Sequence, residues 1–319
     1  MVVAEQPWPH GQFQILALDG GGLKGLFSAA VLADWERDRN VRIADHFDLI
    51  VGTSTGGLVA LGLGAGLTPD QIVDFYARKG PDIFPRSPLS GARKWWRAKH
   101  RSGPLKAALQ EILGDRLLGH SKSRLVVPSY SLDEDEVYLF KTPHHPELRR
   151  DWRETMTDVA LATSAAPTYL PAARLRQHRL VDGGVWANNP CLIGVAEAVS
   201  VLGASLDQIR VLSIGTTDPI SAHPAALNNA GLIQWAKPAG RLVLRAQALG
   251  ALHTTEHLVG ARRVTRIDPK VPDGLFELDR LDADMIRGLA DGVSRRRGED
   301  LGAFSAHRAA GYEPSVPVP

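Results

Sequence analysis

Short apolar runs alternate with stretches of helical periodicity along most of the chain. The runs end in glycine or polar residues, and apolar side chains recur three and four positions apart between several of them. Runs typical of strands are Phe13–Leu18, Phe47–Val51, Arg124–Pro128, Val137–Phe140, Leu180–Val181, Arg210–Ile214 and Val264–Ile267. This alternation predicts an α/β fold, with a mostly parallel sheet between two helical layers.

The helical segments carry recognisable signals. Leu26–Arg37 and Gly194–Leu202 have helical apolar spacing, and Thr68 with Gln71 forms a capping box that predicts a helix through Tyr76. Two more helical patterns cover residues 235–260 and 278–304. We expect them to complete the core, although an oligomerisation or regulatory role is the alternative. The chain is therefore predicted to be a single domain over 1–319, with its motifs in about 13–215 and a helical C-terminal completion in about 216–319.

Composition narrows the classes of function. The 37 basic and 35 acidic residues of the 319 give a net charge of +2, so we expect no DNA or RNA partner. Cys191 is the single cysteine, which excludes an intrachain disulfide and a Cys-x-x-Cys metal site and is typical of a reducing cytoplasm. With no signal-peptide pattern and no apolar run of about 20 residues, we expect a cytoplasmic protein that can touch membranes from outside.

The motif at residues 15–25, ILALDGGGLKG, fits two different chemistries. Gly20, Gly22 and Gly25 match the G-x-G-x-x-G turn of dinucleotide-binding proteins, which also need an acidic residue at the end of the next strand. Asp48 has about the right spacing but opens the second apolar run instead of closing it. A nucleotide-binding oxidoreductase is therefore the disfavoured alternative.

A second motif, Gly52-Thr53-Ser54-Thr55-Gly56, follows the second strand and precedes an apolar helical stretch. This G-x-S-x-G context is that of a nucleophile elbow, in which a sharp turn exposes the serine hydroxyl and small neighbours let the backbone bend. Ser54 is thus the candidate nucleophile, with Gly52 and Gly56 supporting the turn.

The glycine loop then has a natural role as an oxyanion hole. Consecutive glycines that enter a helix present backbone amides with no side chain in the way, and one such donor is worth roughly 3 to 4 kcal/mol to acyl transfer. The candidate donors are Gly20, Gly21, Gly22 and Gly25.

The serine also needs a base. The late histidines have no distinctive setting, whereas Asp182 ends a short apolar strand and is followed by Gly183 and Gly184, which allow close approach of another segment. Such an Asp-Gly-Gly sequence is also common in simple turns. The histidines in question are His223, His253, His257 and His307.

Taken in order, Asp-Gly-Gly-Gly-x-x-Gly, Gly-x-Ser-x-Gly and Asp-Gly-Gly resemble the motifs of the patatin-like phospholipases. The resemblance covers about residues 13–215 and includes ADHFDLIVGTSTGGLVALGL, LATSAAPTYLP and LVDGGVWANNP. It implies the three-layer α/β/α patatin fold, a Ser54–Asp182 dyad without histidine or catalytic cofactor, and an oxyanion hole made chiefly by the Gly21 and Gly22 amides. An ordinary aspartate, with a pKa near 3.9, is a weak base, so we expect modest turnover on simple esters.

Lys24 stands where the family usually has arginine. Lysine keeps the positive charge but loses the planar fork that braces a loop or a phosphate with two hydrogen bonds. Its alternative interpretation is a solvated residue of the first helical turn.

Within the family, FDLIVGTSTGG, TPDQIVDFYARKGPDIF and DGGVWANNP look most like the bacterial effector phospholipases of anti-phage cyclic-oligonucleotide (CBASS) signalling. That resemblance implies a cytoplasmic enzyme that a cyclic dinucleotide activates allosterically and that then degrades inner-membrane phospholipids, with assembly into a homo-oligomer. The alternatives are an unregulated patatin-like acyl hydrolase or esterase and a catalytically silent lipid-binding scaffold.

The segment 80–100 is rich in proline, serine and basic residues and interrupts the pattern. It is either a surface loop followed by a helix or a flap that faces a membrane or a ligand, since indoles favour interfaces and cations favour anionic headgroups. Candidate contacts for a cyclic dinucleotide or an anionic lipid are Arg86, Arg93, Lys94, Arg97, Lys99 and Arg101, with Trp95 or Trp96 to stack on a base.

Overall fold

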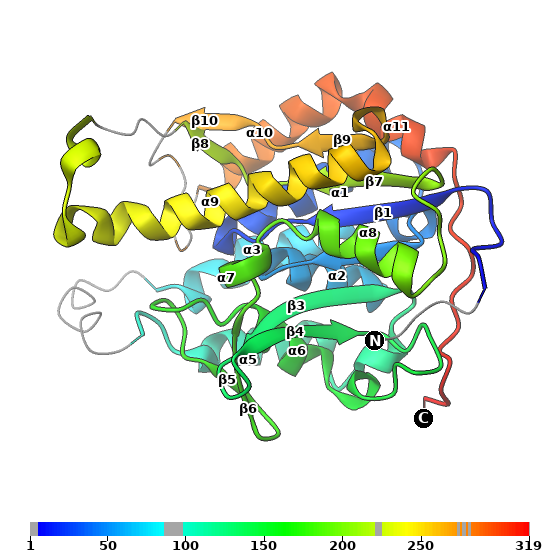
Figure 1. Ribbon diagram of the computed structural model, residues 1–319, viewed down its shortest axis with the longest axis horizontal. Helices are drawn as coiled ribbons and strands as arrows, with labels where there is room; N and C mark the ends of the chain where they lie inside the picture. Colours follow the sequence, from blue (N-terminus) through cyan, green and yellow to red (C-terminus); the bar gives the residue numbers. More distant parts are fainter. Residues whose placement is uncertain are drawn as a thin grey trace.

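The fold is described by a computed structural model that covers residues 6–85, 98–220, 225–272, 275, 279 and 282–318. A twisted sheet forms the middle layer and helices cover both of its faces (Figure 1). The expected three-layer α/β/α architecture with a mostly parallel sheet is therefore confirmed.

The main sheet has the strand order β5-β6-β3-β2-β1-β7-β9, and β4 pairs with β3 off this path. Pairing is parallel from β3 through β9, whereas β3 pairs antiparallel with β4 and β6, and β5 antiparallel with β6. A separate pair joins β8 to β10 in parallel. The strands are β1 Phe13–Leu18, β2 Leu49–Gly52, β3 Leu125–Ser131, β4 Glu136–Lys141, β5 Ala173–Leu175, β6 His178–Asp182, β7 Ile209–Ile214, β8 Asp218–Ile220, β9 Val264–Ile267 and β10 Lys270–Pro272.

Two hydrophobic cores lie on the two faces of the sheet. One contains α1, α2, α3, α5, α6, α10 and α11, and the other contains α8 and α9. None of the helices in the described ranges is long and apolar enough to cross a bilayer. The helices are α1 Gly25–Arg39, α2 Thr55–Gly64, α3 Pro69–Ile83, α5 Ser102–Leu113, α6 Met156–Thr163, α7 Gly184–Ala187, α8 Cys191–Ser200, α9 Leu232–Val259, α10 Ala283–Arg296 and α11 Gly298–Ser305.

The sequence of strand β1 does not alternate between polar and apolar residues, and the position of the strand in the sheet explains why. Phe13, Ile15 and Ala17 join the core beneath α8, while Leu16 and Leu18 join the opposite core. A central parallel strand is buried on both faces, so each of its apolar residues contributes to one core or the other. The burial of all six residues of β1 follows from this position.

The sequence located the longer elements well and missed short ones. The strand expected at Phe47–Val51 begins only at Leu49. Just before it, the Gln14 amide of β1 binds the side-chain carboxylate of Asp48. The strands β5, β8 and β10 have three residues each, too few for a hydrophobic period. The C-terminal part also adds β9 to the main sheet and is therefore not only helical.

Asp48 has a structural role at the amino end of β2. It is 1% exposed, and its carboxylate accepts hydrogen bonds from the Gln14 amide (2.8 Å), the Ala310 amide (2.8 Å) and Nε2 of His307 (2.7 Å). This carboxylate therefore fastens the C-terminal tail across the sheet edge opposite the glycine loop. In a dinucleotide-binding protein, the acidic residue that binds the ribose lies at the carboxyl edge of the sheet. The position of Asp48 at the amino edge therefore argues against that alternative.

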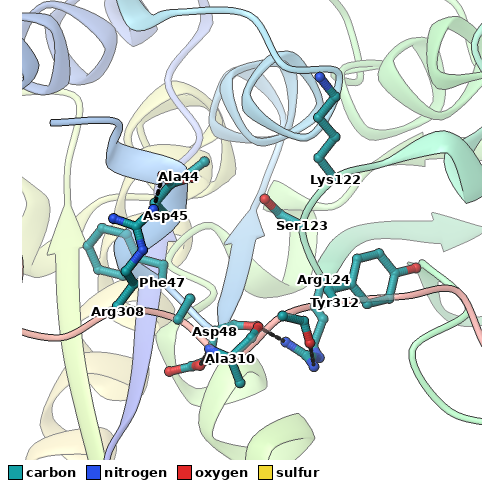
Figure 2. Close-up of a pocket in the computed structure, with 12 residues that line it drawn as sticks. Ala44, Asp45, Phe47, Asp48, Lys122, Ser123, Arg124, Arg308, Ala310 and Tyr312 are labelled. Carbon is teal, nitrogen blue, oxygen red and sulfur yellow. Dashed lines mark hydrogen bonds and ion pairs between the residues drawn. The ribbon is translucent and has the colours of Figure 1, made fainter.

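A pocket of about 180 Å³ that opens to solvent lies beside the tail (Figure 2). Arg124 forms one wall, donates to the carbonyls of Ala310 and Gly311 (both 3.1 Å), and faces the rings of Trp8 and Tyr312 at 5.4 Å. The described lining contains no residue of the three motifs. This pocket is a structural feature of the tail contact.

Replacing the buried carboxylate of Asp48 should weaken the attachment of the C-terminal tail and so destabilise the fold. We expect Asp48→Ala to lower the free energy of unfolding by about 3 kcal/mol, because it leaves the buried Gln14 amide and the part-buried Ala310 amide without an acceptor. Urea denaturation followed by circular dichroism measures this change. Asp45→Ala is the control, since Asp45 pairs with Arg308 at the exposed surface and should cost about 0.5 kcal/mol or less. Equal losses in the two variants would contradict the assignment.

Candidate active site

Four strand ends bring the predicted motifs together. Leu18 of β1 lies opposite Gly52 of β2 and Ile214 of β7, so the segments that follow these strands are neighbours. Asp182 at the end of β6 pairs with Ser129 of β3. Because parallel strands end at the same edge, the glycine loop and the serine turn meet at the carboxyl edge of the sheet.

The turn at Ser54 has an unusual backbone conformation. Its φ is 54° and its ψ is −122°, a region that non-glycine residues seldom occupy and that is typical of functional turns. The chain is packed so tightly here that a Cβ atom on Gly52 would lie 2.2 Å from the Gly56 carbonyl oxygen, and one on Gly56 would lie 2.2 Å from that of Leu18. Only glycine fits at either position.

A threonine outside the motifs holds this turn in place. The Ser54 amide donates to Oγ1 of Thr163 (2.9 Å), and that hydroxyl donates to the carbonyl of Pro128 (2.6 Å). The Ser54 amide is thereby satisfied inside the protein. Thr163 lies in the LATSAAPTYLP block, but nothing in that stretch of sequence marks it as a residue of the site.

Ser54 and Asp182 form a direct pair. Oγ of Ser54 donates to Oδ2 of Asp182 over 2.6 Å, and the Gly184 amide donates to Oδ1 over 2.7 Å. The two residues are only 8% and 5% exposed, and burial raises the pKa of Asp182 to about 6, although both hydrogen bonds lower it. The carboxylate is thus a stronger base than an ordinary aspartate and overcomes part of the weakness expected from the sequence.

The late histidines lie elsewhere. His307 binds Asp48 at the opposite edge of the sheet, and His253 and His257 are exposed on α9. His223 falls outside the described residues. Asp182 accepts its hydrogen bonds from Ser54 and Gly184, and the pair needs no imidazole to orient it.

The glycine loop lies beside the serine. A Cβ atom on Gly20 would be 3.3 Å from Cβ of Ser54. The Gly20 amide donates to the carbonyl of Asn188 (3.0 Å), and the Gly25 amide donates within the first helical turn. These two glycines are therefore wrong as oxyanion donors, because their amides are already used.

Gly21 and Gly22 differ from their neighbours in the loop. Within the described part of the chain, neither the Gly21 amide nor the Gly22 amide donates a hydrogen bond. Gly22 has a φ of 62°, which suits glycine, and a Cβ atom on Gly21 would lie 2.0 Å from Oγ1 of Thr216. The loop therefore keeps two amides available at the start of a helix, where an anion is favoured.

The Asp-Gly-Gly turn supports both halves of the site. A Cβ atom on Gly183 would lie 2.3 Å from the Pro128 carbonyl oxygen, so only glycine lets β6 approach β3 here. Gly184 opens α7 and supplies the amide that binds Asp182. Asn188, just after α7, reaches back to the Gly20 carbonyl over 3.4 Å.

Arg266 on β9 braces the glycine loop from behind. Its guanidinium binds both carboxylate oxygens of Asp19 (3.0 and 2.6 Å), and it also donates to Oγ of Ser213 (2.7 Å) and Oδ2 of Asp268 (2.8 Å). Burial raises the pKa of Asp19 to about 6 while Arg266 lowers it. The sequence gives no sign of this role, because no motif surrounds Arg266 and it lies more than 200 residues from the loop.

Lys24 is not the solvated residue of the alternative interpretation. It is half-buried, and its Nζ donates to the carbonyl of Thr217 over 3.3 Å. Burial lowers the pKa of Lys24, with Asp268 acting against this change. Lys24 thus ties the first helical turn to the segment after β7, on the same side as Arg266.

The predicted cationic contacts cannot be placed with the others. Arg86, Arg93, Lys94, Trp95, Trp96 and Arg97 lie outside the described residues. Lys99 forms an ion pair with Asp279 and lies over the Tyr169 ring at 5.6 Å. Arg101 is exposed at the start of α5. Use of these residues by an anionic ligand stays a prediction.

A buried serine–carboxylate pair beside two available amides is the arrangement of a serine hydrolase that acts on esters through an acyl-enzyme. In the described ranges, no group of three or more histidine, cysteine, aspartate or glutamate side chains is placed to hold a metal ion. Residues 16–195 match the model of the family described as "Patatin-like phospholipase".

Relatives extend the match over most of the chain. The chain is 36% identical to a "cGAMP-activated phospholipase" of Pseudomonas aeruginosa over 94% of its own length and 89% of that protein's. It is 32% identical to a protein of the same name from Vibrio cholerae, with 93% of each covered. A solved structure of VipD from Legionella pneumophila shares the fold with a TM-score of 0.50 at 12% identity, covering 93% of this chain and 67% of that one. The chain belongs to the patatin-like phospholipase family.

The raised pKa of Asp182 predicts an acid limb in the activity profile. The base must be ionised to accept the Ser54 proton, and a pKa of about 6 means that the ionised form is lost as the pH falls below that value. We expect kcat/KM on a soluble ester to fall about tenfold per pH unit below about pH 6. Asp182→Asn should lower kcat by about three orders of magnitude or more.

Asp133→Asn is the matched control for this test. Asp133 lies in the turn between β3 and β4, where it binds Arg179 at the surface. It should keep both the rate and the pH profile of the unaltered protein. A flat profile from about pH 5 to 7, or an active Asp182→Asn variant, would contradict the assigned base.

Arg266 should act as a positioning residue for the glycine loop. We expect Arg266→Gln to lower kcat more than about tenfold with little change in KM, because the loop amides bind the oxyanion only in the transition state. Arg266→Lys should recover part of the rate, since it keeps the charge without the fork. Steady-state kinetics on a soluble ester, with the melting temperature measured in parallel, provide the test.

The partner of Arg266 gives a second check. If Arg266 acts through Asp19, the effects of Arg266→Gln and Asp19→Asn on kcat should not add in the double variant. A loss seen only in the melting temperature, with kcat unchanged in the folded protein, would assign Arg266 a purely structural role.

Proposed function

We propose that this chain hydrolyses the acyl esters of membrane glycerophospholipids, with Ser54 as nucleophile and Asp182 as general base. The observation that carries the proposal is the 2.6 Å hydrogen bond from Ser54 to Asp182 beside the Gly21 and Gly22 amides. Both side chains come from buried strand ends, so their geometry is set before a substrate arrives. Such preorganisation lowers the barrier to attack.

Two half-reactions follow from this geometry. Oγ of Ser54 attacks the ester carbon while Asp182 takes its proton, and the Gly21 and Gly22 amides stabilise the developing oxyanion. Asp182 then returns the proton to the leaving lysophospholipid oxygen, which leaves an acyl group on Ser54. In the second half, Asp182 removes a proton from water, and the water attacks the acyl-enzyme. The bond from the acyl carbon to Oγ of Ser54 then breaks, Asp182 returns the proton to Oγ, and the fatty acid is released. A base with a pKa near 6 can both take and return a proton close to neutral pH.

We also propose that a cyclic dinucleotide activates the enzyme. Two relatives that cover most of the chain are named cGAMP-activated phospholipases, which supports cGAMP as the first activator to test. The enzyme would then act in anti-phage defence as a cytoplasmic protein that attaches to the inner membrane when active and assembles into a homo-oligomer. Contacts from Arg93, Lys94, Trp95, Trp96 and Arg97 to the activator belong to the same proposal.

An unregulated acyl hydrolase is the second candidate. The hydrogen bond between Ser54 and Asp182 joins the two side chains directly and includes none of the proposed activator contacts, which favours some basal activity. The two candidates differ in how strongly the rate depends on the nucleotide.

Hydrolysis of a fluorogenic phospholipid separates the two candidates. We expect slow basal release of fatty acid and an increase of more than about tenfold when cGAMP is added at saturating concentration. Ser54→Ala should remove both rates, because the nucleophile is lost. A fast rate that no cyclic dinucleotide alters would contradict the regulation, and no hydrolysis under any condition would contradict the enzyme function.

A further inference from the structure

Helix α9 has two parts with different surroundings. Its C-terminal part packs on α8 and the sheet, where Leu252 and Val259 are buried and Thr255 contacts Cys191. Its N-terminal part extends beyond the edge of the sheet layer (yellow in Figure 1). A helix that leaves the core in this way is expected to turn polar toward solvent.

The N-terminal part instead exposes apolar side chains. Leu242, Val243 and Leu249 are 38%, 58% and 39% exposed, and Ala246 between them is exposed too. At 3.6 residues per turn these four positions lie along one side of α9, away from the side on which Leu252 and Val259 are buried. We call Leu242, Val243, Ala246 and Leu249 the α9 ridge. Grouped exposed apolar residues mark interaction surfaces more than isolated ones do.

The segment of chain that carries the α9 ridge has ionised side chains of one sign only. Residues 219–255 contain no aspartate or glutamate, while Lys237, Arg241 and Arg245 lie within them. An apolar strip on a basic segment is complementary to an anionic lipid surface, where acyl chains lie beneath negative headgroups. Two copies of this segment placed face to face would instead bring like charges together.

The same part of α9 contacts the catalytic turn. Nε2 of Gln247 donates to the carbonyl of Gly184 over 2.9 Å, and the amide of Gly184 binds Asp182. Gln247 lies within two turns of every residue of the α9 ridge. A surface bound to the ridge would therefore lie close to the Ser54–Asp182 pair.

We propose that the α9 ridge docks the enzyme on the surface of an anionic phospholipid bilayer, by insertion of Leu242, Val243 and Leu249 among the lipid headgroups. The proposal rests on the proposed function, since it places the bilayer that holds the substrate next to the catalytic pair. The ridge supplies attachment, and the Ser54–Asp182 pair supplies the chemistry.

Vesicle binding tests the ridge without hydrolysis. Full-length Ser54→Ala protein is mixed, with and without cGAMP, with sedimentable vesicles of phosphatidylethanolamine and phosphatidylglycerol or of phosphatidylcholine alone. We expect binding to the anionic vesicles, and at least about tenfold weaker binding when Leu242→Gln and Val243→Gln are added, because each apolar side chain loses its burial. Leu258→Gln is the matched control, since Leu258 is 45% exposed on α9 but away from the ridge.

A soluble substrate separates attachment from catalysis. In the protein that retains Ser54, the ridge variants should hydrolyse vesicle phospholipid at least about tenfold more slowly and a monomeric short-chain ester at the unaltered rate. If the double variant folds poorly by circular dichroism, Val243→Gln alone replaces it, since this side chain is more than half exposed.

Several results would overturn the docking proposal. These are the absence of vesicle binding by the Ser54→Ala protein with and without cGAMP, unchanged binding by the ridge variants, and an equal loss in Leu258→Gln. A change of sedimentation coefficient in the ridge variants with unchanged vesicle binding would assign the ridge to contacts between copies. Vesicle binding by a protein that cleaves no ester would leave the ridge in place and refute the enzyme function instead.

Discussion

The chemistry of this protein depends on one buried carboxylate. Asp182 loses most of its hydration at the end of β6, so it keeps a proton more readily than an aspartate in water. Two hydrogen bonds, from Ser54 and from the Gly184 amide, fix both of its oxygens. Desolvation strengthens the base while these hydrogen bonds keep it oriented, and a two-residue site can therefore work without histidine.

Other residues at this edge of the sheet hold the serine turn and the glycine loop in the conformations that the Ser54–Asp182 pair requires. Thr163 fixes the serine turn through the Ser54 amide, and Thr216, Asn188 and Arg266 hold the glycine loop. Arg266 and Asp19 form a buried ion pair that also satisfies Ser213 and Asp268, so its cost of burial is offset by several hydrogen bonds. The donors for the oxyanion thus depend on strands β7 and β9 from the distant C-terminal part.

The two edges of the sheet have different tasks. At the amino edge, Asp48 and Arg124 bind the C-terminal tail and close the fold. The reactive groups, Ser54 and Asp182, lie at the carboxyl edge. Helix α9 extends beyond the sheet layer and exposes the apolar α9 ridge. Asp48 illustrates how spacing alone misleads. Its distance along the chain from the glycine loop suits a residue that binds a ribose, but it directly precedes strand β2 and therefore lies at the wrong edge of the sheet.

The sequence by itself determined the fold class, the long strands and helices, and the candidate nucleophile and base, because hydrophobic period and glycine-rich turns are local properties of the chain. It could not determine which loop amides remain available: Gly20 and Gly25 lose theirs to hydrogen bonds that only the folded loop shows. It also could not reveal Arg266, Thr163 or the α9 ridge. Those depend on contacts and exposure between segments far apart in the chain, which exist only once the sheet has brought the segments together.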